Sequence, residues 1–124
     1  MNPVGWFEIP VNDFDKAKKF YEGVFGVEIS VNVVGPLKMG WFPMDNMDKY
    51  GATGSLVQGV GYTPSSCGVI IYFSVPDIEA SLKKVEALGG KTLLAKTDIG
   101  EYGFMAHFLD TEGNHVAFHT AAKM

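Results

Sequence analysis

Apolar and polar positions along this chain follow two different periods, one after the other. The stretch that begins at Trp6 is rich in aromatic and β-branched residues, which is typical of a strand. Phe14, Ala17, Tyr21 and Val24 then recur at three- and four-residue spacing, as on the buried face of a helix. The pattern therefore predicts a strand followed by an amphipathic helix.

The same order of periods returns later in the chain. The stretch "WFEIPVNDFDKAKKFYEGVFGVEIS" resembles "IIYFSVPDIEASLKKVEALGGKTLL". Asp13 and Asp77 precede the two helical patterns, and each offers a carboxylate to the first free helix amides. Gly26 and the Gly89-Gly90 pair follow the patterns and tolerate the positive φ at which helices commonly end. The chain is therefore expected to contain an internal repeat.

Three extended segments follow each predicted helix. They are about Val27–Val34, Leu37–Met44 and Thr53–Gln58 in the first half, and about Lys91–Asp98, Tyr102–Leu109 and Asn114–Thr120 in the second. The order βαβββ occurs twice, which predicts the α+β class. Two such units can cover the sheet face that one leaves bare. We expect a single domain over residues 1–124, with modules at about 5–58 and about 68–120 and a Gly-, Ser- and Pro-rich linker at about 59–67.

Composition and charge narrow the classes of partner. The chain is 47% hydrophobic with a net charge of −4, which argues against disorder and, without a basic stripe, against nucleic acid. The start "MNPVGWFEIP" lacks the pattern of a secretory signal, and no apolar run approaches membrane-spanning length. Cys67 is the only cysteine, which fits a reducing compartment. We therefore predict a cytoplasmic protein that binds neither nucleic acid nor membrane.

Several segments carry a resemblance to a known superfamily. The stretches "VNDFDKAKKFYEGVFG", "VPDIEASLKKVEALGG" and "FLDTEGNHVAF", in this order and spacing, resemble the vicinal oxygen chelate superfamily of glyoxalase I, bleomycin-resistance proteins and extradiol dioxygenases. "GWFEIPV", "KTDIGEYG" and "DTEGNHVAFH" are similar to its glyoxalase-related subgroup. The resemblance implies two tandem βαβββ modules that curve around a concave cavity, and a homodimer. In the metalloenzymes of the family, each module supplies two ligands to a divalent ion that acts as a Lewis acid.

The resemblance places four metal-ligand positions on this chain, and none of them carries a good ligand. The first-strand positions fall at Trp6 and Ile70. The last-strand position of the second module falls at Ala117, and that of the first module within residues 54–57, "GSLV". Divalent cations need nitrogen, oxygen or sulfur donors. We therefore predict no metal and no other cofactor, with a relocated divalent ion as the disfavoured alternative.

His115 and His119 do not restore a metal site. The run "HVAFH" is predicted to be a strand, so side chains four positions apart lie roughly 13 Å apart at about 3.3 Å per residue. Metal–nitrogen bonds are only about 2 Å long. Because strand side chains alternate between faces, the two imidazoles instead share one face with Ala117.

The same alternation predicts a mostly apolar pocket with a few polar groups. Glu8, Tyr72 and His119 are the candidate catalytic residues, because they fall on cavity-facing positions. The predicted ligand-binding residues are Trp6, Ile70, Trp41, Met39, His115 and Ala117. If Glu8 is buried in its apolar strand, its charge must be paired or its pKa raised, which suits a general base or a structural pair. The pattern does not decide which face His107 occupies.

Three functions remain open on this basis. The first is binding of a small organic molecule in an apolar cavity without the metal of the family, and we rank it slightly higher. The second is a glyoxalase-related lyase or isomerase, or a dioxygenase-type enzyme, acting without metal, with Glu8 as base and His119 or Tyr72 as acid. The third is a metalloenzyme whose ligands have moved, for example to Glu8 and His119.

Overall fold

The computed structural model describes residues 3–44 and 51–122, in which two helices and two four-stranded mixed sheets confirm the predicted α+β class. In chain order the elements are β1 (Trp6–Pro10), α1 (Phe14–Phe25), β2 (Ser30–Val34), β3 (Leu37–Trp41), β4 (Thr53–Gln58), β5 (Tyr72–Ser74), α2 (Ile78–Ala87), β6 (Lys91–Asp98), the short 3₁₀ helix η1 (Gly100–Tyr102), β7 (Phe104–Leu109) and β8 (His115–Thr120). Two tandem βαβββ modules result. Neither described helix is long and apolar enough to cross a membrane.

The predicted caps start and stop the helices. The carboxylates of Asp13 and Asp77 accept hydrogen bonds from the backbone amides of Lys16 and Ala80, each at 3.2 Å. The chain leaves α1 at Gly26, whose φ of 64° lies in the left-handed region that favours glycine. The sequence thus encodes these helix ends locally.

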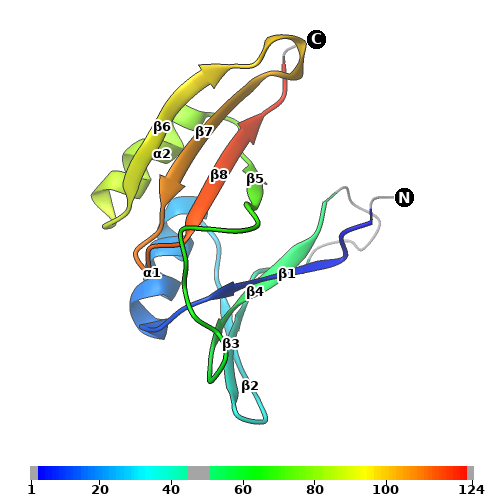
Figure 1. The fold of residues 1–124 in the computed structure, drawn as a ribbon, viewed down its shortest axis with the longest axis vertical. Coiled ribbons are helices and arrows are strands. Elements are labelled where there is room, and N and C mark those ends of the chain that lie inside the picture. Colours follow the sequence, from blue (N-terminus) through cyan, green and yellow to red (C-terminus); the bar gives the residue numbers. More distant parts are fainter. Residues whose placement is uncertain (1–2, 45–50, 123–124) are drawn as a thin grey trace.

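The strands form two sheets that are not hydrogen-bonded to each other. The strand order is β1-β4-β3-β2 in the first sheet and β5-β8-β7-β6 in the second. Strands β1 and β5 are therefore edge strands, each paired in parallel with the last strand of its own module. Figure 1 shows the two sheets splayed apart, with these two edges facing each other across the gap.

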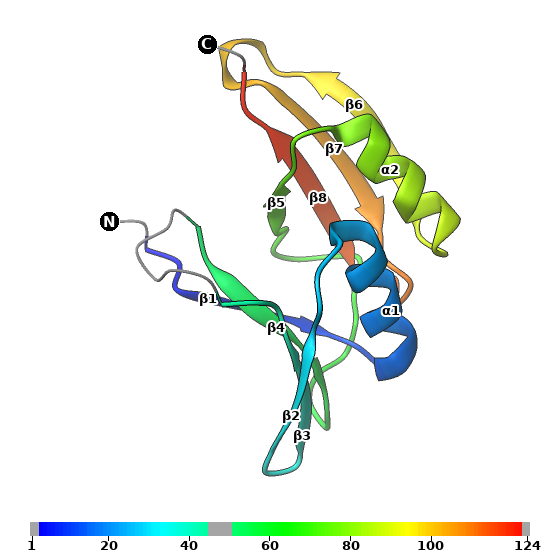
Figure 2. The ribbon, with the colours of Figure 1, turned by 180° about the vertical axis from the view of Figure 1, so that it is seen from behind.

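The two helices cover one face of each sheet. Helix α1 contacts β3 and β4, α2 contacts β6, β7 and β8, and the helices also pack against each other, as Figure 2 shows from behind. The core between these layers is aromatic, with Phe20, Tyr21, Phe108 and Phe118 almost fully buried. We call the sheet faces turned away from the helices the open faces.

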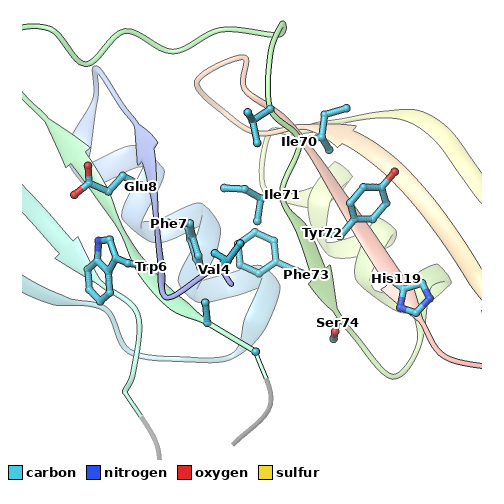
Figure 3. A pocket seen from close by; sticks show the side chains of 13 residues that line it. Val4, Trp6, Phe7, Glu8, Ile70, Ile71, Tyr72, Phe73, Ser74 and His119 are labelled. Carbon is cyan, nitrogen blue, oxygen red and sulfur yellow. The ribbon is translucent and has the colours of Figure 1, made fainter. Parts of the chain in front are cut away.

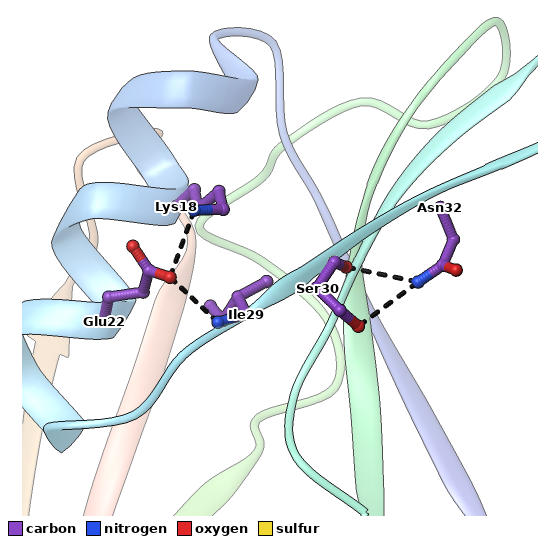
Figure 4. A network of polar contacts seen from close by, with 5 residues as sticks. All are labelled: Lys18, Glu22, Ile29, Ser30 and Asn32. Atoms are coloured by element: carbon purple, nitrogen blue, oxygen red, sulfur yellow. Dashed lines mark hydrogen bonds and ion pairs between the residues drawn. The ribbon is translucent and has the colours of Figure 1, made fainter.

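Some strand ends differ from the sequence-based prediction. Strand β2 begins at Ser30 rather than Val27, because the carboxylate of Glu22 on α1 accepts a hydrogen bond from the amide of Ile29 at 2.8 Å and also pairs with Lys18 (Figure 4). The chain before β2 is thereby tied to the helix instead of the sheet. The other revised ends are β3 at Trp41 rather than Met44, β7 at Phe104 rather than Tyr102, and β8 at His115 rather than Asn114.

Two kinds of contact join the modules. The rings of Phe7 and Phe73 meet edge to face with centroids 5.5 Å apart, and so link β1 to β5. The turn between β7 and β8 reaches the first module, where the carboxylate of Glu112 accepts from the amide of Asp13 at 2.7 Å. The side-chain amide of Asn114 donates to the carbonyl of Pro10 at 2.8 Å. These contacts hold the two edge strands on opposite sides of one gap.

Candidate functional site

A pocket of about 900 Å³ lies between β1 and β5 (Figure 3). Its described lining consists of Val4, Trp6, Phe7, Glu8, Gly51, Ala52, Val69, Ile70, Ile71, Tyr72, Phe73, Ser74 and His119. The walls are mostly apolar, and the polar side chains are few. All three candidate catalytic residues, together with Trp6 and Ile70, contribute to this lining.

The polar residues of the pocket share its rim but do not converge. Figure 3 shows Trp6 and Glu8 extending to one side of the gap and Tyr72 and His119 to the other, with Phe73 between them. This divergence follows from the splay of the two sheets. Within one chain, therefore, Glu8 and His119 are not placed to grip one small group from both sides.

Glu8 is not buried, although its position in an apolar strand allowed for that. Its side chain is exposed on the open face of the first sheet, opposite Ser55 of β4. An exposed carboxylate can accept hydrogen bonds from a ligand without first being neutralised. His119 is more constrained, because its Nε2–H donates to the carbonyl of Tyr102 at 2.8 Å, which leaves only Nδ1 to contact a ligand.

Four of the predicted ligand-binding residues lie outside the lining of this pocket. Trp41 packs edge to face against Trp6, with centroids 6.1 Å apart, and Met39 is buried beside it on β3. Ala117 is fully buried in β8, and His115 lies near the start of that strand. These residues belong to the open faces that flank the pocket.

The four metal-ligand positions can now be assigned individually. Glu8 pairs with Ser55 as Tyr72 pairs with Ala117, so Ser55 is the counterpart of Ala117 in the first module. Ser55 is fully buried, and its hydroxyl has no hydrogen-bond partner among the described residues. The other three positions, Trp6, Ile70 and Ala117, carry no donor suited to a divalent ion. This set of residues does not fit the metal that the fold implies.

A hydrogen-bonded chain of three side chains lies on the open face of the second sheet. The hydroxyl of Tyr72 is 2.9 Å from Nε2 of His107, and Nδ1 of His107 is 2.6 Å from Nε2 of His115. Burial, followed by the charge of His115, holds the pKa of His107 below its usual value. These contacts span β5, β7 and β8.

His107 is the residue that sequence reasoning missed. Its neighbours in "MAHFLD" are apolar, so its face could not be assigned from periodicity alone. The register of the hairpin around the turn at residues 110–114 determines the face of His107. Leu109 pairs with His115, and His107 therefore pairs with Ala117. Treating "LDTEGNH" as a hairpin turn would have placed His107 on the same face as Ala117.

Comparison with known sequences gives one family. The sequence model of the Glyoxalase/Bleomycin resistance protein/Dioxygenase superfamily matches residues 4–118. A "Glyoxylase-like domain-containing protein" of Didymella fabae is 31% identical over 118 residues, which cover 90% of this chain and 88% of that protein. CFP32 of Mycobacterium tuberculosis (strain CDC 1551 / Oshkosh) is 28% identical over 124 residues, and this chain spans only 45% of its length.

Solved structures share the fold. The glyoxylase/bleomycin resistance protein/dioxygenase domain from Frankia sp. EAN1pec superimposes with a TM-score of 0.75 at 12% identity, covering 98% of this chain and 99% of that one. A glyoxalase I mutant from Zea mays gives a TM-score of 0.71 at 21% identity, covering 95% of this chain and 46% of that one. The arrangement of two βαβββ modules is therefore common to all three proteins.

Proposed function

Because this chain belongs to the Glyoxalase/Bleomycin resistance protein/Dioxygenase superfamily, we propose that it binds a small organic molecule between β1 and β5 without a metal at the ligand positions of the family. The pocket between the two edge strands is the observation that carries the proposal. Its volume of about 900 Å³ lies within the range of small-molecule sites, and its apolar walls with few polar groups are typical of them.

The lining suggests the chemistry of the ligand. The exposed rings of Trp6 and Tyr72 offer faces for stacking, and Phe7 and Phe73 form an apolar floor. Glu8 offers carboxylate oxygens, which accept hydrogen bonds. The best ligand is therefore a flat, largely apolar molecule that carries an O–H or N–H donor near one end.

Ligand binding can be tested by thermal denaturation with a panel of aromatic, phenolic and dicarbonyl compounds in the presence of EDTA. A ligand that binds only the folded chain raises Tm progressively as its concentration exceeds Kd, because it adds RT ln(1 + [L]/Kd) to the free energy of unfolding. Trp6→Ala should abolish the shift. Val33→Ala is the matched control, because Val33 is exposed on β2 away from the pocket. A shift that survives Trp6→Ala, or no shift across the panel, would contradict binding at this pocket.

A metal-free enzyme is the second candidate, and the contact between Tyr72 and His107 favours it. An imidazole that hydrogen-bonds a phenol can take up or return the phenol proton, so Tyr72 could serve as a general acid beside the pocket. Glu8 would then be the base of a glyoxalase-related lyase or isomerase, or of a dioxygenase-type enzyme. Turnover of a dicarbonyl or catechol substrate, with a pH profile altered by Glu8→Gln, would support catalysis over binding alone.

A relocated metal shared by Glu8 and His119 remains the least supported alternative, since Figure 3 shows them on opposite sides of the gap. Elemental analysis of tag-free protein purified without chelators tests it. We expect no stoichiometric Zn, Ni, Mn or Fe whose retention depends on Glu8 or His119. One equivalent that disappears in Glu8→Ala or His119→Ala would replace the metal-free proposal with a metalloenzyme.

We also propose a cytoplasmic homodimer. The family resemblance suggests the dimer, and Val4, Trp6 and Tyr72 of the pocket lining also offer exposed apolar surface. Cys67 is exposed and unpaired, which suits a reducing compartment. Light scattering coupled to size exclusion should give twice the chain mass of 13.5 kDa, whereas a mass of 13.5 kDa would exclude the dimer.

A further inference from the structure

All three histidines of the chain lie on the open face of the second sheet, and two of them are in contact. Nδ1 of His107 and Nε2 of His115 are 2.6 Å apart, and the ring centroids are 4.9 Å apart with the planes nearly perpendicular. Both side chains are partly exposed, so solvent reaches this face. Two imidazole nitrogens therefore face each other from neighbouring strands on a surface that solvent reaches.

We propose that Nδ1 of His107 and Nε2 of His115 bind one late first-row transition-metal ion. Bonds from zinc to imidazole are about 2.0–2.1 Å long and arranged tetrahedrally, so two such nitrogens on one ion lie about 3.3 Å apart. The two rings therefore need to separate by about 0.7 Å and to turn so that both lone pairs point at the ion instead of at each other. This site differs from the four family positions, and it does not depend on small-molecule binding between β1 and β5.

A metal ion can replace the proton between the two nitrogens without a change in the charge of either ring. Without an ion, one proton lies between the two facing nitrogens. If Nε2–H of His107 donates to the Tyr72 hydroxyl oxygen, Nδ1 of His107 presents a lone pair. The shared proton then belongs to Nε2 of His115. When the ion binds, this proton moves to Nδ1 of His115, so two neutral rings bind the ion with no net proton release.

Tyr72 and Ala117 prepare His107 for this role. Metal-bound histidines usually donate their second N–H to an oxygen, which fixes the tautomer and the ring orientation, and the hydroxyl of Tyr72 is placed to accept that bond. Ala117 lies between them, because it pairs with Tyr72 on one side and with His107 on the other. Its methyl group is short enough to let the two rings meet across β8.

The donor set selects the kind of ion. Imidazole suits Zn²⁺, Cu²⁺ and Ni²⁺, whereas Mg²⁺ and Ca²⁺ prefer oxygen ligands. Among residues 3–44 and 51–122, no group of three or more His, Cys, Asp or Glu side chains could hold a metal. Two protein ligands leave the remaining coordination positions to water or to an added oxygen donor. The site should therefore bind reversibly, with Cu²⁺ tighter than Ni²⁺ or Zn²⁺.

Isothermal titration of the tag-free chain with Ni²⁺ at neutral pH tests the site. We expect one saturable equivalent, and no heat of binding with Mg²⁺. His107→Gln and His115→Gln should each weaken the affinity by at least about tenfold, and Tyr72→Phe by about tenfold, as for the loss of an outer-shell partner. His119→Gln is the matched control, because it removes the third histidine and leaves the pair intact.

A second measurement needs no substitution. In an NMR titration of the unaltered chain with Cu²⁺, paramagnetic broadening should begin at the imidazole signals of His107 and His115. Failure to saturate at one equivalent, equal loss in His119→Gln, or broadening centred on Glu8 would overturn the proposal. The thermal-shift assay for organic ligands contains EDTA, so it measures ligand binding without any metal ion. Failure of one proposal therefore does not affect the test of the other.

Discussion

Ala117 shows how much one small side chain can decide. It occupies the position where the family resemblance places a metal ligand, and its methyl group offers none. The same methyl group lets the ring of Tyr72 approach that of His107, with centroids 5.4 Å apart. The missing donor atom at Ala117 and the contact between Tyr72 and His107 therefore have one cause, the small size of this side chain.

A longer side chain at Ala117 should separate Tyr72 from His107. Because Ala117 is fully buried, Ala117→Leu should overpack the site and lower the free energy of unfolding by about 1–3 kcal/mol, measured by chemical denaturation. It should also weaken Ni²⁺ binding. Ala121→Leu, at an exposed position just beyond β8, should change neither. An unchanged Ni²⁺ affinity in Ala117→Leu would show that Tyr72 does not orient His107.

A second prediction at the scale of the residue concerns the stability contribution of Tyr21. It is fully buried, and its hydroxyl donates to Asp110 at 2.7 Å, so Tyr21→Phe leaves a buried carboxylate with one partner fewer. We expect a loss of about 1–3 kcal/mol in the free energy of unfolding. Tyr102→Phe, at an exposed phenol, is the control and should be nearly neutral. Equal stability of the two variants would contradict the role of this hydrogen bond.

The pH dependence of the free energy of unfolding at alkaline pH also follows from Tyr21. Burial and the charge of Asp110 hold the pKa of Tyr21 well above its usual value. Above about pH 10 the unfolded chain loses the phenol proton while the folded chain retains it, so the free energy of unfolding falls as pH rises. Denaturation of the unaltered chain at increasing alkaline pH should show this fall, and Tyr21→Phe should reduce it.

At the scale of the element, local hydrogen bonds determine where helices and strands begin. Asp13 and Gly26 bound α1 as their side-chain chemistry and backbone freedom predict. Strand β2 starts later than predicted, because Glu22 accepts from the amide of Ile29. A contact between a helix and the following strand is not visible in the apolar pattern of either one.

Glu22→Gln should change the acid stability of this junction. The hydrogen bond from the Ile29 amide, with the charge of Lys18, lowers the pKa of Glu22. A lowered carboxyl pKa contributes stability above about pH 4.5, and this contribution is lost as pH falls through the folded-state pKa. The variant should therefore lose less stability between neutral and acid pH. Glu79→Gln, at an exposed carboxylate on α2, is the control for general charge effects.

At the scale of the whole molecule, the turn between β7 and β8 joins the two modules. The carboxylate of Glu112 accepts from the amides of Asn12 and Asp13, and Asn114 bonds to Pro10 and to the amide of Ser65. These bonds and the contact between Phe7 and Phe73 set the angle between the sheets. That angle determines whether Glu8 and His119 can reach one ligand.

Glu112→Ala should loosen this junction without unfolding either module. Two amides at the start of α1 lose their acceptor, and partial exposure limits the cost to about 1 kcal/mol. Hydrogen exchange of Asn12 and Asp13 should accelerate, while the amides of β6 and β7 remain protected. Glu101→Ala, an exposed residue of η1, should leave the exchange of Asn12 and Asp13 unchanged. Equal acceleration in both variants would contradict the role of Glu112.

The sequence by itself determined what depends on residue type and local period: the two βαβββ modules, the caps at Asp13 and Asp77, and the lack of ligands at Trp6, Ile70 and Ala117. A side chain without a lone pair cannot bind a metal in any fold. Only the tertiary structure decided that Ser55 is the fourth position, that His107 faces His115, and that Glu8 diverges from His119. Strand register and the angle between sheets depend on contacts between residues far apart in the chain, which local periodicity does not encode.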